Sequence, residues 1–338
     1  MNIKSAWLTT NRSCNNKCDW CYARNALSEK SLMDIEKAKK IIDQLVSINV
    51  KKIILIGGEP TIYEHFVELI QYIHSKGLII ALASNGRRFA NKDFARETVE
   101  AGVNGIDISL KATSEEDYVS KTHSKGLMEM LQGYKNLVEL GFQPSISYVV
   151  VNDDKEEFEK VISLLTQNQI NNIVIQFVKP VLDTKEKHEE FDLKKMGKFV
   201  PYIYNRLEEE KFSYSIDLSF PLCLVDLSVL TALIEKHRIM TCCHIQKGSG
   251  IIFDTNFKVL PCNHFAEFPF SGEIDISDSN SIEKLWSSEG VKEFRKYTQY
   301  YPSKHCSNCD LWNKCGGGCF TRWLYENPNE FITAPIKL

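Results

Sequence analysis

The sequence has no surplus of either charge, no long apolar run and no signal peptide. Its 338 residues carry 41 basic and 44 acidic side chains, a net charge of −3. This balance excludes the basic footprint of a nucleic-acid-binding protein and gives no attraction to an anionic membrane. The longest strongly apolar stretch, residues 78–83, is too short to cross a bilayer, and the N-terminus lacks an apolar signal core. We therefore expect a cytoplasmic protein with no nucleic-acid or membrane partner.

Cysteine is missing from residues 22–222, although the chain has eleven cysteines in all. Three of them, Cys14, Cys18 and Cys21, lie near the start, and the other eight fall between Cys223 and Cys319. The number is odd and the density is far below that of a disulfide scaffold. Clustered thiols in a reducing cytosol are more often metal ligands or catalysts than bridges. The distribution therefore indicates a metal site towards each end.

The first half of the chain alternates short β-branched runs with amphipathic helical patterns. The expected strands, most of them buried on both faces, are residues 7–9, 53–56, 78–83, 105–110, 145–151 and 172–178. The expected helices are residues 34–49, 61–76, 127–140 and 154–167; the second opens with the capping box Thr61-x-x-Glu64. This alternation predicts an α/β fold of six units with a parallel sheet. Periodicity alone leaves an open doubly wound sheet and a partial barrel as alternatives.

After Pro180 the alternation is expected to break. Residues 183–211 are rich in charge and predict solvated helix and loop, and residues 251–261 predict a hairpin that turns near Thr255 and Asn256. Beyond the hairpin, short elements are interrupted by Cys, Gly and Pro. We expect a barrel domain over residues 1–180, a bridging helical segment over 181–240, and a cysteine-rich α+β domain over 241–338.

The motif Cys14-x3-Cys18-x2-Cys21 directly follows the first expected strand. Three thiolates on one tight loop suit three corners of an iron–sulfur cubane and leave the fourth iron open to a small molecule. The alternatives are a zinc loop or a chance pattern, but structural zinc sites use two well-separated ligand pairs.

A second motif, Gly57-Gly58-Glu59-Pro60, ends the second strand. The glycines allow backbone to approach a ligand closely, Glu59 offers a carboxylate for an ammonium group, and Pro60 suits the start of a helix. Because ligands bind at the carboxyl ends of parallel strands, this motif and the three-cysteine loop are expected at the same edge of the sheet.

With these two motifs and six β/α units, the sequence resembles the radical SAM superfamily, including the aromatic Trp20 directly before Cys21. The resemblance implies a partial (β/α)6 TIM-like barrel and a 4Fe–4S cluster whose open iron chelates S-adenosylmethionine. An electron from the cluster would cleave this cofactor to a 5′-deoxyadenosyl radical that removes a hydrogen atom from substrate. The implied cofactor-binding residues are Trp20, Gly57, Gly58, Glu59, Pro60, Asn85, Ser109 and Asn152. Lys111 departs from the pattern, since many relatives have an acidic residue there.

The C-terminal motif Cys306-x2-Cys309-x5-Cys315-x3-Cys319, with Cys243 and Cys262 upstream, resembles the SPASM domain, which carries up to two auxiliary clusters. The two resemblances together cover nearly the whole chain. There are two departures. Phe257 replaces the glycine expected five residues before Cys262, and no cysteine follows Cys319, so the last cysteine of the motif is missing.

Two closed auxiliary clusters need eight thiolates, and seven remain once the N-terminal three and Cys223 are set aside. The family pattern implies a first auxiliary cluster on Cys243, Cys262 and Cys319, with Cys242 as a further candidate. The second would use Cys306, Cys309 and Cys315, with an open iron or with Asp310, His305 or a more distant side chain as the fourth ligand. Two auxiliary clusters are our hypothesis; a single one is the alternative.

Cys223, in Pro-Leu-Cys-Leu-Val, admits two interpretations. It is either a small buried hydrophobic residue or a functional thiol, which would donate hydrogen to a substrate radical or bind a cluster. Of the histidines only His244 and His305 lie beside expected ligands. The sequence has no Ser/His/Asp or metal-hydrolase arrangement.

The leading hypothesis for function is maturation of a ribosomally made peptide by a crosslink, a thioether bond or epimerisation, since SPASM proteins often catalyse such steps. The barrel begins within the first ten residues, so a separate partner is expected to bind the leader peptide, and flavodoxin or ferredoxin is an expected electron donor. The second hypothesis is dehydrogenation or decarboxylation of a sugar, aminocyclitol or nucleoside. The third is a non-catalytic iron–sulfur or zinc sensor.

Overall fold

The computed structural model describes residues 2–180, 192–240, 243–266, 268–270, 274–275 and 277–337. The chain divides into two compact units, which we describe separately. The first unit comprises Met1–Ser145 with Lys247–Tyr297, and the second comprises Ile146–Gln246 with Thr298–Leu338. Cys242 and residues 181–191 of the charge-rich tract lie outside the described residues. The expected boundaries at 180 and 241 stay predictions.

Strands of the first unit follow one another in the order β6-β5-β4-β1-β11-β12. Their bounds are β1 Ser5–Thr9, β4 Lys52–Ile56, β5 Ile79–Ser84, β6 Gly105–Leu110, β11 Gly250–Phe253 and β12 Val259–Leu260. All neighbours from β6 to β11 are parallel, and only β11 and β12 pair in antiparallel fashion. A separate antiparallel pair is formed by β2 (Asn11–Arg12) and β3 (Ser28–Leu32). The parallel arrangement confirms the α/β class.

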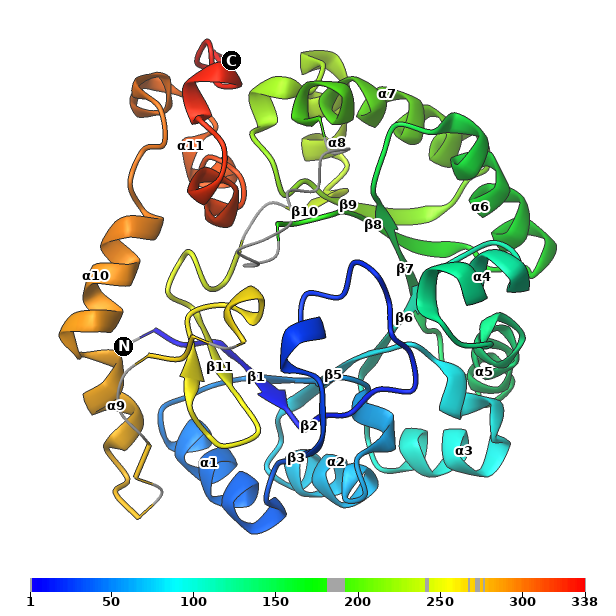
Figure 1. Cartoon of the computed structure of the whole chain (residues 1–338), viewed down its shortest axis with the longest axis vertical. Coiled ribbons are helices and arrows are strands. Elements are labelled where there is room, and N and C mark those ends of the chain that lie inside the picture. The colour runs from blue at the N-terminus through cyan, green and yellow to red at the C-terminus, as the bar shows by residue number, and fades with distance from the viewer. Residues whose placement is uncertain are drawn as a thin grey trace. The chain divides into compact units, whose positions relative to one another are not determined.

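The helices of the first unit bury one apolar face each. Their bounds are α1 Ile35–Ser47, α2 Phe66–Ser75, α3 Lys92–Glu100, α4 Glu115–Thr122, α5 Leu127–Glu139, α9 Ser281–Trp286 and α10 Glu289–Thr298. In α1, for example, Ala38, Ile41, Ile42 and Leu45 are fully buried. Figure 1 shows α1, α2 and α3 together on one side of β4 and β5. The expected strands 53–56, 78–83 and 105–110 match β4, β5 and β6 to within one residue at each end.

The second unit continues the β/α alternation. Its strands lie in the order β10-β9-β8-β7, all parallel, with bounds β7 Ser145–Val150, β8 Asn172–Phe177, β9 Ser213–Asp217 and β10 Ile239–Met240. Its α-helices are α6 Lys155–Gln167, α7 Leu193–Glu209, α8 Leu227–Glu235 and α11 Trp312–Cys315. The expectation that the pattern breaks after Pro180 was therefore wrong, because α7 leads into β9, which pairs with β8.

The expected helix start at Thr61 was also wrong. Residues Pro60–Ile62 form a short 3-10 turn, and α2 begins only at Phe66. The Thr61 hydroxyl donates to the Glu59 carboxylate at 2.6 Å instead of capping the amides that follow it. The Glu59 carboxylate thus holds Thr61 back in the short turn that precedes α2.

The expected hairpin is confirmed, since β11 and β12 pair as antiparallel strands around the turn at residues 254–258. The Phe257 amide donates to the Asp254 carbonyl at 2.9 Å, and Phe257 has a φ of 64°. This is the left-handed region, which glycine adopts most easily. The structure therefore gives a physical reason for the glycine that the motif has at this position.

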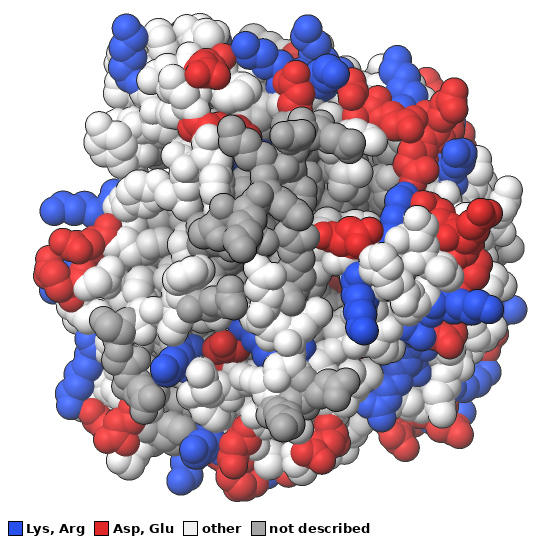
Figure 2. All heavy atoms as spheres, in the orientation of Figure 1, with Lys and Arg blue, Asp and Glu red and all other residues white. Residues whose placement is uncertain are grey.

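Among the described residues, no helix is both long enough and apolar enough to cross a membrane. On the face seen in Figure 2, the described lysine and arginine side chains are interspersed with aspartate and glutamate. This mixture agrees with the small net charge of the sequence.

Candidate functional site

Cys14, Cys18 and Cys21 lie on one loop that follows β2, and each side chain is partly buried. The amide of Cys21 donates to the Cys18 carbonyl at 3.1 Å, and the amide of Asn16 donates to the Cys14 sulfur at 3.4 Å. Burial raises the pKa of the Cys14 thiol to about 12, and the negative charges of Glu59, Cys18 and Cys21 act in the same direction. The loop thus brings the three sulfurs into one region of the first unit.

This donor set suits an iron–sulfur cluster. Burial disfavours an isolated thiolate here, and iron would replace the proton on each sulfur that binds it. In the part of the chain that the structure describes, no three His, Cys, Asp or Glu side chains converge as they would on a single ion. In a cubane each thiolate binds a different iron, so the sulfurs surround a volume. Three thiols on one loop then leave one iron for another ligand.

The glycine motif contacts the segment that leads to these cysteines. The amide of Gly58 donates to the Asn11 carbonyl at 2.8 Å, and the amide of Glu59 donates to the Ser13 carbonyl at 2.8 Å. A Cβ atom on Gly58 would lie 2.1 Å from the Ser13 carbonyl oxygen, which is too close for any side chain. Glycine is therefore required at Gly58 so that the turn after β4 can lie against the cysteine loop.

The Glu59 side chain is buried, with 2% of its surface exposed, and joins the ends of β4 and β5. One carboxylate oxygen accepts from the Thr61 amide and hydroxyl and from the Ser84 hydroxyl at 2.7 Å, and the other accepts from the Asn85 amide at 2.7 Å. Most of the hydrogen-bonding capacity of the carboxylate is used within the protein. The expected contact between Glu59 and a methionyl ammonium stays a prediction.

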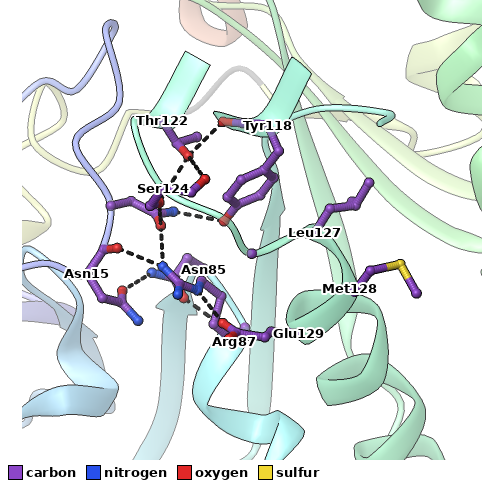
Figure 3. Close-up of polar contacts among 12 residues, drawn as sticks. Asn15, Asn85, Arg87, Tyr118, Thr122, Ser124, Leu127, Met128 and Glu129 are labelled. Carbon is purple, nitrogen blue, oxygen red and sulfur yellow. Dashed lines mark hydrogen bonds and ion pairs between the residues drawn. The ribbon is translucent and has the colours of Figure 1, made fainter. Parts of the chain in front are cut away.

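Figure 3 shows a polar network around Arg87 that holds the cysteine loop from the β5 side. One guanidinium nitrogen donates to the Asn15 carbonyl at 2.6 Å and to the Asn16 side-chain oxygen at 2.8 Å, and another nitrogen lies 2.6 Å from Glu129. Asn85 donates to the Asn15 side chain at 2.6 Å. The two residues after Cys14 are therefore fixed through both their backbone and their side chains.

The end of α4 holds the same loop from another direction. The amide of Lys17 donates to the Thr122 carbonyl at 2.8 Å, and Asp19 lies 2.7 Å from the His123 ring. Asn16 is buried, and its side-chain amide donates to the Tyr118 hydroxyl at 2.9 Å. Every residue from Asn15 to Lys17 therefore has a bonded partner outside the loop.

The other expected cofactor-binding residues, Trp20, Ser109 and Asn152, belong to three different segments of the chain. Trp20 is partly buried, and the Lys111 ammonium lies 6.0 Å from the centre of its ring. Ser109 lies in β6 of the first unit. Asn152 follows β7 in the second unit, where its side chain accepts from the Asp154 amide at 3.3 Å. Burial raises the pKa of the Cys18 thiol, and the positive charge of Lys111 opposes that rise.

A second group of cysteines lines a cavity inside the second unit. Cys223 lines this cavity together with three of the four cysteines of the C-terminal motif, Cys306, Cys309 and Cys315. The cavity holds about 320 Å³ of empty space, part of it open to solvent. Burial raises the pKa of the Cys223 thiol to about 12, and the charges of Cys315, Cys306 and Cys309 act in the same direction. The structure therefore places Cys223 beside three C-terminal cysteines. From the sequence alone, the role of Cys223 had two interpretations.

The two residues named as candidate fourth ligands, His305 and Asp310, differ in whether they line this cavity. His305 is another lining residue of this cavity. The carboxylate of Asp310 lies 3.0 Å from the ammonium of Lys337, and both side chains are exposed.

Cys243 and Cys319 also belong to the second unit. The amide of Gln246 donates to the Cys243 sulfur at 3.5 Å, and the Cys319 sulfur lies 2.9 Å from the Thr321 hydroxyl. Lys179 pairs with Asp217 at 2.8 Å. Burial lowers the pKa of Lys179, but the charges of Asp217, Cys319 and Cys243 outweigh that effect and raise it. A cation is thus held beside two expected cluster ligands.

Cys262 belongs to the first unit and lies near the N-terminal cysteine loop. Burial raises the pKa of the Tyr22 phenol, and the charges of Cys21, Cys262 and Cys14 contribute to that rise. The Tyr22 ring lies 5.4 Å from the His264 ring, two residues beyond Cys262. Cys242 lies outside the described residues.

Sequence reasoning missed the residues that position the cysteine loop: Asn15, Asn16, Arg87, Tyr118 and Ser124, whose hydroxyl donates to the Asn16 side-chain oxygen at 2.8 Å. The available signal was the Asn-Asn pair directly after Cys14 and the Asn-Gly-Arg sequence that follows β5. Neither pattern is specific enough to be recognised without the contacts.

Comparison with protein families shows that residues 8–165 match the model of the Radical SAM superfamily. Among curated proteins, the probable GTP 3′,8-cyclase of Saccharolobus solfataricus is 26% identical over 199 residues, which are 58% of this chain and 64% of that protein. The Fe-coproporphyrin III synthase of Methanosarcina barkeri is 26% identical over 168 residues, 49% of this chain and 42% of that protein. The matched region thus spans less than two thirds of these relatives.

Solved structures share the fold over a longer part of the chain. SuiB of Streptococcus suis, bound to its precursor peptide SuiA, has a TM-score of 0.73 at 16% identity and covers 97% of this chain and 74% of its own. Native anSMEcpe with bound AdoMet has a TM-score of 0.73 at 16% identity and covers 97% of this chain and 96% of its own. At this identity the likeness shows the fold alone.

Proposed function

We propose, starting from the radical SAM domain that residues 8–165 form, that this enzyme modifies a ribosomally made peptide. The observation that carries the chemistry is the loop on which Cys14, Cys18 and Cys21 meet against the Gly57–Glu59 turn. Radical SAM enzymes use a 4Fe–4S cluster with S-adenosylmethionine, and when bound these supply a 5′-deoxyadenosyl radical that abstracts hydrogen from a substrate.

In this chain the three thiols would hold the SAM cluster, and the residues around them would bind and orient the cofactor. The candidates are Trp20, Gly57, Gly58, Glu59, Pro60, Asn85, Ser109 and Asn152. Since the Glu59 carboxylate already accepts four hydrogen bonds, we propose that it mainly fixes the turn after β4. Backbone groups of that turn are then the nearer candidates for the methionyl ammonium.

The extent of the fold likeness favours a peptide substrate. The likeness to SuiB, which was solved with a precursor peptide, includes the C-terminal cysteine region as well as the radical SAM domain. A structure of anSMEcpe was also solved with AdoMet and the Cp18Cys peptide, at a TM-score of 0.72 and 16% identity. The C-terminal region would be a SPASM domain with one or two auxiliary clusters. A separate leader-binding protein and a flavodoxin or ferredoxin would complete the system in the cytoplasm.

A nucleotide is the second candidate substrate, because several curated relatives are probable GTP 3′,8-cyclases. Their likeness covers 58% of this chain or less, whereas the fold likeness to SuiB covers 97% of it. A nucleoside substrate is therefore supported over a smaller part of the chain.

The test is an assay of anaerobically reconstituted, reduced protein. With S-adenosylmethionine alone it should release 5′-deoxyadenosine slowly, whereas a Cys18→Ala variant and a non-catalytic sensor should not. Co-expression with peptides encoded beside the gene should give a mass change on one of them. Turnover of GTP with every such peptide unchanged would support the second candidate and contradict the first.

A further inference from the structure

The cavity in the second unit brings together four thiols from two distant parts of the sequence. Cys306, Cys309 and Cys315 come from the C-terminal motif, and Cys223 comes from the short turn Leu222–Leu224 that follows β9. All four side chains line the same cavity, so the four sulfurs share one environment. The C-terminal motif lacks its expected last cysteine, so three motif cysteines have no fourth thiolate partner from the motif. The structure places the Cys223 thiol in the same cavity as these three.

The segment before Cys223 is joined directly to the C-terminal motif. The amide of Cys319 donates to the Ser219 carbonyl at 2.9 Å, and the amide of Leu222 donates to the Cys315 sulfur at 3.4 Å. Gly318 has a φ of 80°, and a Cβ atom there would lie 2.8 Å from the backbone of Phe220. These contacts, all made by residues just before Cys223, fix its position relative to Cys315.

Neither candidate named from the sequence fits the fourth position as well. The Asp310 carboxylate pairs with Lys337 at the surface. His305 lines the cavity, but its ring nitrogen would have to displace a thiolate that lies in the same cavity, and thiolate is the usual ligand of such clusters.

We propose that Cys223, Cys306, Cys309 and Cys315 are the four thiolate ligands of one closed iron–sulfur cluster, an assignment that rests on the proposed function. This cluster has no open iron, so its role is electron transfer and not the binding of a substrate. Cys223 is then a ligand and not a hydrogen donor. Cys242, Cys243, Cys262 and Cys319 stay outside this set and outside the N-terminal set of three.

The experiment isolates the C-terminal clusters. In a background in which Cys14, Cys18 and Cys21 are all alanine, anaerobic reconstitution should give about eight irons per chain, because two cubanes remain. Adding Cys223→Ala should lower this to about seven irons or fewer, since one iron loses its protein ligand. Mild oxidation should then produce the EPR signal of a three-iron cluster, which the background should lack.

Matched variants separate ligation from packing. His305→Ala and Ile336→Ala change two other lining residues of the cavity and should keep the background iron content and EPR spectrum. Cys306→Ala should reproduce the effect of Cys223→Ala. Unchanged iron content and no three-iron signal in Cys223→Ala would overturn the proposal, as would iron loss in His305→Ala alone or zinc in place of iron.

A second measurement uses the wild-type chain, in case Cys223→Ala does not fold. Loaded protein is alkylated under anaerobic conditions and compared with protein stripped by a chelator. Mass spectrometry should find Cys223 protected in the loaded protein and labelled after stripping; labelling in both would contradict the assignment. Neither readout depends on S-adenosylmethionine, so a chain that fails to cleave this cofactor would refute the proposed function and leave the ligand assignment intact.

Discussion

The chain builds its two cysteine sites in different ways. In the first unit, three thiols from one short loop come together, and side chains such as Arg87 and Asn16 hold that loop. In the second unit, the thiols come from two distant segments joined by backbone hydrogen bonds and by close packing at Gly318. On the proposed assignment, the loop with three thiols would leave one iron open, whereas the cavity with four thiols would close its cluster. Cofactor chemistry would then belong to the first site and electron transfer to the second.

The largest expected effect separates these two roles. Cys18→Ala should abolish release of 5′-deoxyadenosine with a chemical reductant, because the cluster that binds S-adenosylmethionine loses one of its three ligands. Cys223→Ala should still release 5′-deoxyadenosine but should lose formation of the modified product. The measurement is chromatography of the nucleoside and of the product from the same reactions. Equal loss of 5′-deoxyadenosine in the two variants would remove the distinction between the sites.

The next effect concerns the packing of the cysteine loop. Gly58→Ala would place a methyl group 2.1 Å from the Ser13 carbonyl oxygen, so the turn and the loop must separate. Overpacking of this kind costs about 1–3 kcal/mol, and we expect loss of the SAM cluster with the C-terminal clusters retained. Gly105→Ala is the control, because a Cβ atom there meets nothing within 4 Å. Iron content and the EPR response to S-adenosylmethionine would be compared; a normal response in Gly58→Ala would contradict the packing argument.

A smaller effect is expected from the polar residues that hold the loop. Arg87→Lys should lose the paired hydrogen bonds to Asn15 and Asn16, since an ammonium group cannot reproduce the planar guanidinium. Loss of hydrogen bonds to a charged group costs about 1.5–3 kcal/mol, so the affinity for S-adenosylmethionine should fall about ten-fold or more. Iron content of the second site should not change.

The control for Arg87 is Arg96→Lys, because Arg96 pairs with Asp93 on an exposed part of α3. Binding titrations followed by EPR would compare the two variants with the wild type. An affinity in Arg87→Lys equal to that in Arg96→Lys would show that the network around Arg87 does not position the loop.

The sequence predicts structure best where a signal is local and repeated. Apolar runs located β4 and β5, and the alternating apolar residues of GIDISL located β6, each to within one residue. The start of α2 was misplaced because the Thr61 hydroxyl bonds to Glu59, a choice that depends on the buried end of β5. β9 was missed because its sequence, SYSID, alternates polar and apolar residues instead of forming a continuous apolar run, and because it follows a charge-rich tract.

The same distinction applies to the sites. The spacing of Cys14, Cys18 and Cys21 predicts a cluster loop because all its candidate ligands are close in sequence. Cys223 lies far from the C-terminal cysteines in the sequence, and the contacts of Ser219, Leu222 and Gly318 bring it to them. The positioning residues Asn16 and Arg87 belong to common residue types, so their role depends on three-dimensional proximity that no local pattern encodes.

The smallest expected effect concerns the hairpin that leads to Cys262. Phe257 is buried and has a φ of 64°. Phe257→Ala removes the ring but keeps this left-handed backbone, which destabilises a residue that has a Cβ atom by about 1–2 kcal/mol. Phe257→Gly loses the same ring but relieves that strain, and it should be more stable than Phe257→Ala by about 1 kcal/mol. At Phe253, which lies in β11, the order should be reversed, because glycine in a strand is less stable than alanine by about 0.5–1 kcal/mol. Thermal denaturation midpoints of the four variants give the test: the same order at both positions would show that the left-handed backbone at Phe257 is not strained.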